Sequence, residues 1–123
     1  MEIKLSKNSG GIFLLELEGD LDLPGSNQLK DYIIQTVRIR IKRFIISLEN
    51  VEHINSAGIG ALIYVFSTLR KLNCTLIMVV PEGPVFEALE ISRLKNYFSI
   101  VHTMKDALQI TNNKQQKSKG NFR

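Results

Sequence analysis

Residues 53–60 read His53-Ile54-Asn55-Ser56-Ala57-Gly58-Ile59-Gly60 and join a predicted strand to a predicted helix. The strand, residues 43–48, is a short apolar run rich in aromatic and β-branched side chains, which is typical of a strand covered on both faces. The helix, residues 57–72, carries one apolar stripe at helical spacing, formed by Ile59, Leu62, Ile63, Phe66 and Leu69. The pattern therefore predicts a βα unit with Ser56 at the junction.

Strands and helices alternate on both sides of this unit. We expect further strands at residues 2–5, 12–17, 74–80 and 98–101, and further helices that begin between residues 23 and 26, after Pro84, and near residue 105. This alternation predicts an α/β fold of one domain, in which right-handed crossovers build a mixed, mostly parallel central sheet with about four helices.

Such an order of elements brings distant residues together. The strand-to-helix loops of successive right-handed units emerge at the carboxyl edge of the sheet, so residues 19–26, 49–56 and 81–84 should share that edge. Asp20 and Asp22 then become neighbours of Ser56. Turn and helix-cap chemistry alone explains either aspartate, and recognition of a partner near the serine is the alternative interpretation.

Ser56 itself has two interpretations. As the N-cap of the following helix, its side-chain oxygen would accept a hydrogen bond from the amide of Gly58 or Ile59, which contributes about 1 kcal/mol. As a modification site, it would present a hydroxyl at a helix N-terminus, where an anion is tolerated. Gly58 and Gly60 are equally open: they serve either tight packing of the helix against the sheet or close approach of another protein's backbone.

Enzymatic sites find little support. His53 and His102 are isolated and have no metal-ligand spacing, and the single Cys74 forms no thiolate cluster. The Gly-x-Ser-x-Gly elbow of hydrolases is absent around Ser56, and no complete phosphate-binding glycine loop occurs. We therefore expect no catalytic residue, no metal and no cofactor.

Composition points to a small cytoplasmic protein. No apolar run approaches the roughly 20 residues that cross a bilayer, and the first residues lack the form of a secretory signal. The net charge of +4 resides wholly in the end of the chain, because the 12 acidic residues all lie at or before Asp106 together with 12 of the 16 lysines and arginines. We expect residues 1–111 to form the domain and residues 112–123 a basic, disordered tail, with no direct DNA binding.

Residues 54–60 resemble the phosphorylation-site signature of STAS domains, the bacterial anti-sigma factor antagonists, in which a serine or threonine precedes a small residue and a glycine. The resemblance covers roughly residues 3 to 110. Asn55 stands where many phosphorylated members carry Asp, and Arg93 stands where a glycine is common. Further matching segments are Leu17-Glu18-Gly19-Asp20-Leu21-Asp22, residues 44–50, Leu89-Glu90-Ile91-Ser92-Arg93-Leu94 and Asp106-Ala107-Leu108.

The resemblance implies a regulator of transcription in a stress response or in sporulation. Its unmodified form would bind an anti-sigma factor that is also a serine kinase, phosphorylation of Ser56 would end that binding, and a serine phosphatase would reverse it. The residues that would contact the partner are Asp20, Asp22, Asn55, Ala57, Gly58, Ile59 and Gly60.

Two alternatives stay open. The first is a STAS scaffold or accessory module that binds a protein or a small ligand without phosphorylation. The second, less favoured, is an enzyme with an unrecognised site, for which loss of activity in Ser56→Ala with folding intact would be the sign.

Overall fold

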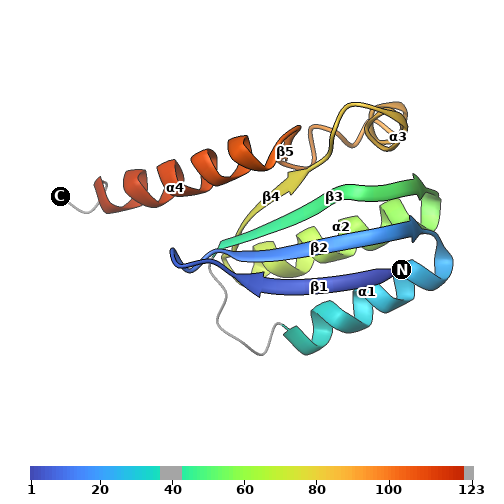
Figure 1. The fold of residues 1–123 in the computed structure, drawn as a ribbon, viewed down its shortest axis with the longest axis horizontal. Coiled ribbons are helices and arrows are strands. Elements are labelled where there is room, and N and C mark those ends of the chain that lie inside the picture. The colour runs from blue at the N-terminus through green and yellow to red at the C-terminus, as the bar shows by residue number, and fades with distance from the viewer. Residues whose placement is uncertain (37–42, 121–123) are drawn as a thin grey trace.

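The structure is a computed structural model that describes the backbone of residues 1–36 and 43–120 and side chains up to residue 112. Figure 1 shows its strands and helices in the order in which they follow one another along the chain. The strands are β1 Glu2–Lys7, β2 Phe13–Leu21, β3 Arg43–Ile54, β4 Thr75–Val79 and β5 Ile100–Val101. The helices are α1 Leu23–Thr36, α2 Ser56–Lys71, α3 Pro84–Ile91 and α4 Met104–Gly120.

The central sheet has the strand order β1-β2-β3-β4-β5. β1 runs antiparallel to β2, and the remaining neighbours pair in parallel. The predicted α/β class, with a mixed and mostly parallel sheet, is thereby confirmed. The β1–β2 hairpin is closed by Asn8, whose Oδ1 accepts hydrogen bonds from the amides of Gly10 and Ile12, both at 2.9 Å.

Apolar side chains pack on both faces of the sheet. On one face, alternate residues of β2, β3 and β4 pack with α1, α2, α3 and Phe98 into the larger core, in which Phe44 and Phe66 are fully buried. On the other face, Ile45 and Ile77 pack beneath Ala107 of α4 in a smaller core. The single-residue alternation along β3 explains this division, because successive strand side chains point to opposite faces.

β2 and β3 are longer than predicted. Segments expected to be loops, residues 19–21 and 49–54, belong instead to these two strands, which pair as Gly19↔Val51, Asp20↔His53 and Leu21↔Ile54. Register shifts near Gly19 interrupt the pairing, and Gly19 has a φ of 110°, in the left-handed region that glycine adopts easily. The predicted meeting of these two segments at one edge is correct, although they meet as paired strands.

The C-terminal elements also differ from expectation. β5 comprises only Ile100–Val101, and α4 continues to Gly120, so the backbone is helical where the sequence analysis placed a disordered tail after residue 111. The described apolar contacts of α4 with the sheet come from its first two turns, for example Met104, Ala107 and Leu108. The division into a domain at residues 1–111 and a separate tail stays a prediction.

Candidate functional site

The junction between β3 and α2 is built by Asn55. Its backbone is extended, with φ −117° and ψ −174°, and its Oδ1 accepts a hydrogen bond from the amide of Gly58 at 3.1 Å. Its carbonyl accepts the first helical hydrogen bond, from Ile59 N at 3.0 Å. Asn55 is therefore the N-cap of α2, and the prediction that Ser56 has this role is wrong by one position.

Ser56 is the first residue of α2 and is exposed. Among the described residues no protein group hydrogen-bonds its hydroxyl. Neither capping nor packing accounts for a serine at this position. The hydroxyl is thus accessible at a helix N-terminus, where the backbone amides of the first turn favour a negative charge.

The two glycines of the first helical turns have different roles. A Cβ on Gly58 would lie 2.1 Å from the Leu21 carbonyl oxygen and 2.9 Å from side-chain atoms of Leu21 and Ile54, so only glycine fits where α2 crosses the end of β2. A Cβ on Gly60 would meet nothing within 4 Å, and Gly60 is exposed. Packing explains Gly58, whereas no contact within the described chain explains Gly60.

The two aspartates lie on either side of Leu21 and have separate partners. Asp22 closes the start of α1: its Oδ1 accepts from Gly25 N at 3.0 Å, and its carbonyl accepts from the Ser26 hydroxyl at 2.6 Å. Asp20 binds His53 Nδ1 at 2.9 Å. Both aspartates lie at the same edge as Ser56, and neither makes a hydrogen bond to it within the described residues. The hydrogen bonds of Asp22 are those of a helix cap, so capping of α1 accounts for this residue.

The pairing of His53 with Asp20 is the feature of this edge that sequence reasoning missed. The hydrogen bond to Asp20, followed by the negative charge of Asp20, raises the pKa of His53 above its ordinary value of 6.5; weak desolvation opposes the shift and Glu52 adds to it. One potential metal-ligand atom from each of Asp20, Glu52 and His53 lies within 4.8 Å of the other two. All three side chains are exposed, and the hydrogen bond between Asp20 and His53 explains why these two lie together without a metal ion. Only the β2–β3 pairing brings them together, so spacing along the sequence gave no signal.

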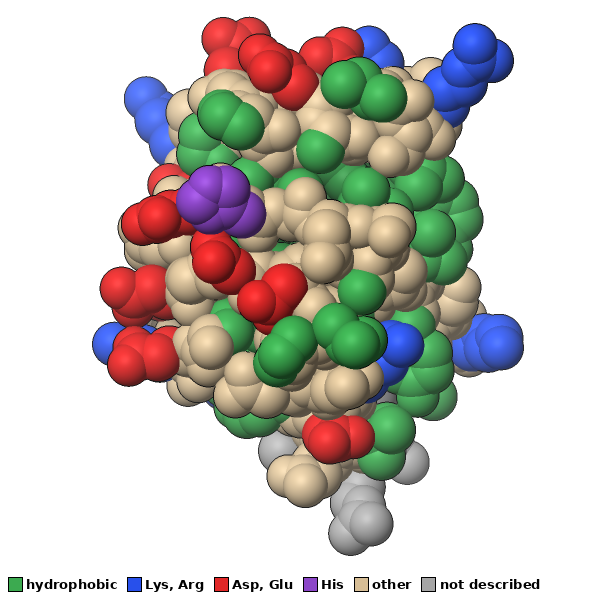
Figure 2. Space-filling model, turned by 90° about the vertical axis from the view of Figure 1, so that its right-hand side faces the viewer, with side chains coloured by type: hydrophobic (Ala, Val, Ile, Leu, Met, Phe, Trp, Pro, Cys, Tyr) green, Lys and Arg blue, Asp and Glu red, His purple; other side chains and the backbone are tan. Residues whose placement is uncertain are grey.

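The edge around Ser56 is acidic. Neither lysine nor arginine occurs in residues 8–29, 44–69 or 72–92, the segments that supply the ends of β2, β3 and β4 and the starts of α1, α2 and α3. Figure 2 looks at this edge and shows several acidic side chains gathered around the histidine. A phosphate on Ser56 would find no basic side chain in these segments except the imidazole of His53.

Comparison with known proteins identifies the family. Residues 4–107 match the STAS domain family, and the chain belongs to it. Similar solved structures include an anti-sigma factor antagonist from Mycobacterium paratuberculosis, with 20% identity, a TM-score of 0.82 and coverage of 90% of this chain and 93% of that one. The Bacillus cell fate determinant SpoIIAA in its phosphorylated form has 17% identity, a TM-score of 0.65 and coverage of 88% and 97%.

A third similar structure belongs to a different kind of protein. It is a sulfate transporter family protein from Wolinella succinogenes, with 17% identity, a TM-score of 0.75 and coverage of 87% of this chain and 88% of that one. At these identities the similarity establishes the shared STAS fold. Within the described part of this chain, no helix combines the length and the apolar character needed to span a bilayer.

Proposed function

We propose that this protein is an anti-sigma factor antagonist controlled by phosphorylation of Ser56. In the cytoplasm, the unmodified form binds an anti-sigma factor that is also a serine kinase, and sigma factor is released for transcription. The kinase transfers the γ-phosphoryl group of ATP to the Ser56 hydroxyl, which ends the interaction, and a serine phosphatase restores the hydroxyl. The protein acts as substrate and binder and performs no catalysis of its own.

The observation that carries this proposal is the exposed hydroxyl of Ser56 at the N-terminus of α2, which makes no hydrogen bond within the described residues. A phosphoserine has a charge of about −1.5 to −2, and the helix end accommodates it while the domain is free. A docked partner would desolvate that charge beside an edge that already carries Asp20 and Glu52. A 100-fold loss of affinity needs only about 2.7 kcal/mol, which is well within the cost of burying an unpaired charge.

The partner-binding surface surrounds Ser56. Asp20, Ala57, Ile59 and Gly60 supply contact area, and the open space above Gly60 lets another backbone approach α2 closely. Asn55, Asp22 and Gly58 act mainly by holding this surface in shape, through the two helix caps and the tight crossing over Leu21. Asn55 retains the capping oxygen that an aspartate would provide but lacks its charge.

The direct test is intact-mass measurement of the protein purified from its native cells, with the modified residue mapped. We expect a species heavier by one phosphoryl group, located on Ser56 and absent from Ser56→Ala. In binding assays with the anti-sigma factor encoded in the same genome, Ser56→Ala should bind as wild type does, and Ser56→Asp should bind at least about 100-fold more weakly. Equal affinity of the two variants would contradict a charge-based switch.

The second candidate is an accessory STAS module that binds a protein or small ligand without phosphorylation. The similarity to the sulfate transporter family protein favours it, as does Asn55 in place of the aspartate of many phosphorylated members. Under this candidate, Ser56 stays unmodified in cells under all growth conditions, and Ser56→Ala and Ser56→Asp have the same phenotype.

A further inference from the structure

β3 continues well past its pairing with β4, and a groove lies beside the extension. The β3–β4 pairing ends at Ser47↔Val79, whereas β3 runs on to Ile54. After β4, residues 81–84 form a turn beside this extension and lead into α3. The space between the extension and the turn is a groove of about 290 Å³.

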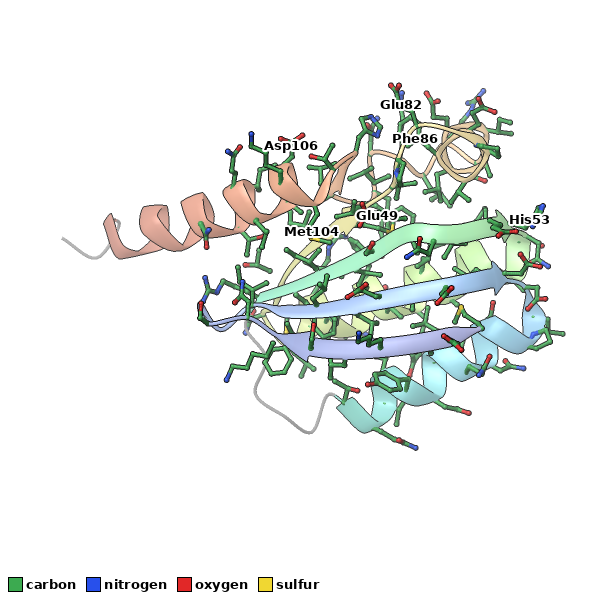
Figure 3. All side chains as sticks on the ribbon, viewed as in Figure 1. Glu49, His53, Glu82, Phe86, Met104 and Asp106 are labelled. Carbon is green, nitrogen blue, oxygen red and sulfur yellow. The ribbon has the colours of Figure 1, made fainter. Side chains whose placement is uncertain are left out.

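The groove has an apolar floor and an acidic rim. Its floor contains the nearly buried side chains of Leu48, Val51 and Val85. Its rim carries three exposed glutamates, Glu49 and Glu52 from β3 and Glu82 from the turn. Figure 3 shows Glu49 beside β3 and Glu82 on the chain that leads into α3.

Within the described residues, Glu49 and Glu82 have no cationic partner, and Glu52 has the nearby imidazole of His53, whose pKa it helps to raise. The ion pairs found there join His53 to Asp20 and Lys95 to Glu90, and neither includes a rim glutamate. Glu49 Oε1 accepts one hydrogen bond, from the Ser47 hydroxyl at 2.9 Å, which holds the carboxylate at the rim. The carboxylates of Glu49 and Glu82, beside an apolar floor, are therefore available to a positive group from outside.

We propose that this groove receives an arginine or lysine side chain of the protein that docks at the Ser56 edge. The aliphatic stem of such a side chain covers apolar surface while its charged head contacts carboxylates, which matches the floor and the rim. The groove lies close to Ser56 along the chain, because Glu52 is on the β3 extension that leads through Asn55 into α2. The inference rests on the proposed function for the nature of the partner, and it adds a specific anchor on that partner.

A small probe tests the groove without the partner. Backbone amide NMR spectra are recorded during titration with N-acetyl-arginine methylamide and, as a neutral isostere, N-acetyl-citrulline methylamide. We expect saturable shifts at residues 48–52 and 81–85 with the arginine probe only. The double variant Glu49→Gln/Glu82→Gln should weaken its binding about fivefold, the upper end for one exposed ion pair, whereas Glu87→Gln, an exposed glutamate outside the groove, should not.

Three results would overturn the groove proposal: equal binding of the citrulline probe, equal loss of affinity in Glu87→Gln, or no saturable shift at the groove. Thermal unfolding of each variant verifies that the fold is intact. Failure here is distinguishable from failure of the proposed function, because the mass measurement on Ser56 does not involve the groove. If Ser56 is phosphorylated but the groove binds no arginine, only the groove proposal is wrong. If the groove binds arginine but Ser56 is never modified, only the phosphorylation switch is wrong.

Discussion

The side chain of Asn55 holds the first turn of α2, because its Oδ1 accepts the Gly58 amide at 3.1 Å. Asn55→Ala should lower the free energy of unfolding by about 1 kcal/mol, as removal of an N-cap usually does. Ser56→Ala should change it by less than about 0.5 kcal/mol, since the Ser56 hydroxyl is exposed and unbonded. Urea denaturation measures both values. A larger loss in Ser56→Ala than in Asn55→Ala would assign the cap to the serine after all.

Gly58 and Gly60 form a matched pair of positions on the same helix. Gly58→Ala should destabilise the protein by about 2 kcal/mol or more, because the new methyl group collides with the Leu21 carbonyl and the backbone has to move. Gly60→Ala should stabilise it by up to about 1 kcal/mol, since alanine favours a helix and its methyl group meets no neighbour.

Measuring partner binding distinguishes the roles of Gly58 and Gly60 further. Gly60→Ala should bind the anti-sigma factor more weakly although it folds more stably, because the methyl group occupies the space that the partner's backbone approaches. Titration calorimetry beside chemical denaturation gives both quantities for the same sample. Unchanged affinity in Gly60→Ala would show that the partner does not approach the helix there.

The residue types in the sequence predicted which segments come together at the candidate site, but not the role of each residue there. Asparagine and serine are both good N-caps, so propensity could not decide between adjacent positions 55 and 56. The two glycines look alike in the sequence, and only the crossing of α2 over Leu21 separates them. Arg93 follows α3 with a φ of 60°, which explains physically why a glycine is common at this place in the family.

At the scale of the elements, the Asp20–His53 pair joins the ends of β2 and β3. The raised pKa of His53 means that the folded state binds a proton more tightly than the unfolded state does. The pair therefore stabilises the fold below pH 6.5, and this contribution is lost as the pH rises through the higher pKa of the folded state. Because the two side chains are 77% and 52% exposed, the effect on stability should be small and should weaken with added salt.

An NMR titration of the His53 ring measures this pKa directly. Asp20→Asn should lower it, because the variant loses both the hydrogen bond to the carboxylate and its charge, which are the two largest causes of the shift. Glu52→Gln should lower it less. Asp22→Asn is the matched control, since Asp22 caps α1 and is not among the causes of the His53 shift. An unchanged pKa in Asp20→Asn would mean that the pair does not form in solution.

The type and order of the elements could be predicted from the sequence, but the lengths of several could not. Periodicity identified the interior of β3 by its apolar run, yet its second half carries Glu49, Asn50, Glu52 and His53, which read as a loop. Those polar residues form a strand because β2 pairs with them, which is a tertiary contact. The groove depends on the difference in length between β3 and β4, and so it could not be predicted from the sequence.

At the scale of the whole molecule, negative charge gathers at one edge of the sheet, and the segments that form this edge contain no lysine or arginine. The loops that follow β2, β3 and β4 converge on this edge because all three strands are parallel, and none of their segments contains lysine or arginine. Steering by such an edge favours a basic partner and raises its association rate at low salt. Under the proposed function, a phosphate on Ser56 would add charge to a surface that is already negative, so one modification would be sufficient for a large change in affinity.

The switch should operate without refolding, because Ser56 is exposed and is not part of the hydrophobic core. In amide NMR spectra, Ser56→Asp compared with Ser56→Ala should shift resonances of the first turn of α2 and of the adjacent end of β2, while those of β4, β5 and α4 stay in place. The melting temperature of Ser56→Asp should be equal or slightly higher, since an anion at a helix N-terminus contributes about 0.3–1 kcal/mol. Ser56→Asn, which is close in shape to aspartate and uncharged, is the control for size. Shifts that spread through the sheet, or a clear drop in melting temperature, would mean that the charge acts by altering the fold, and loss of partner binding would then no longer report on the docking surface.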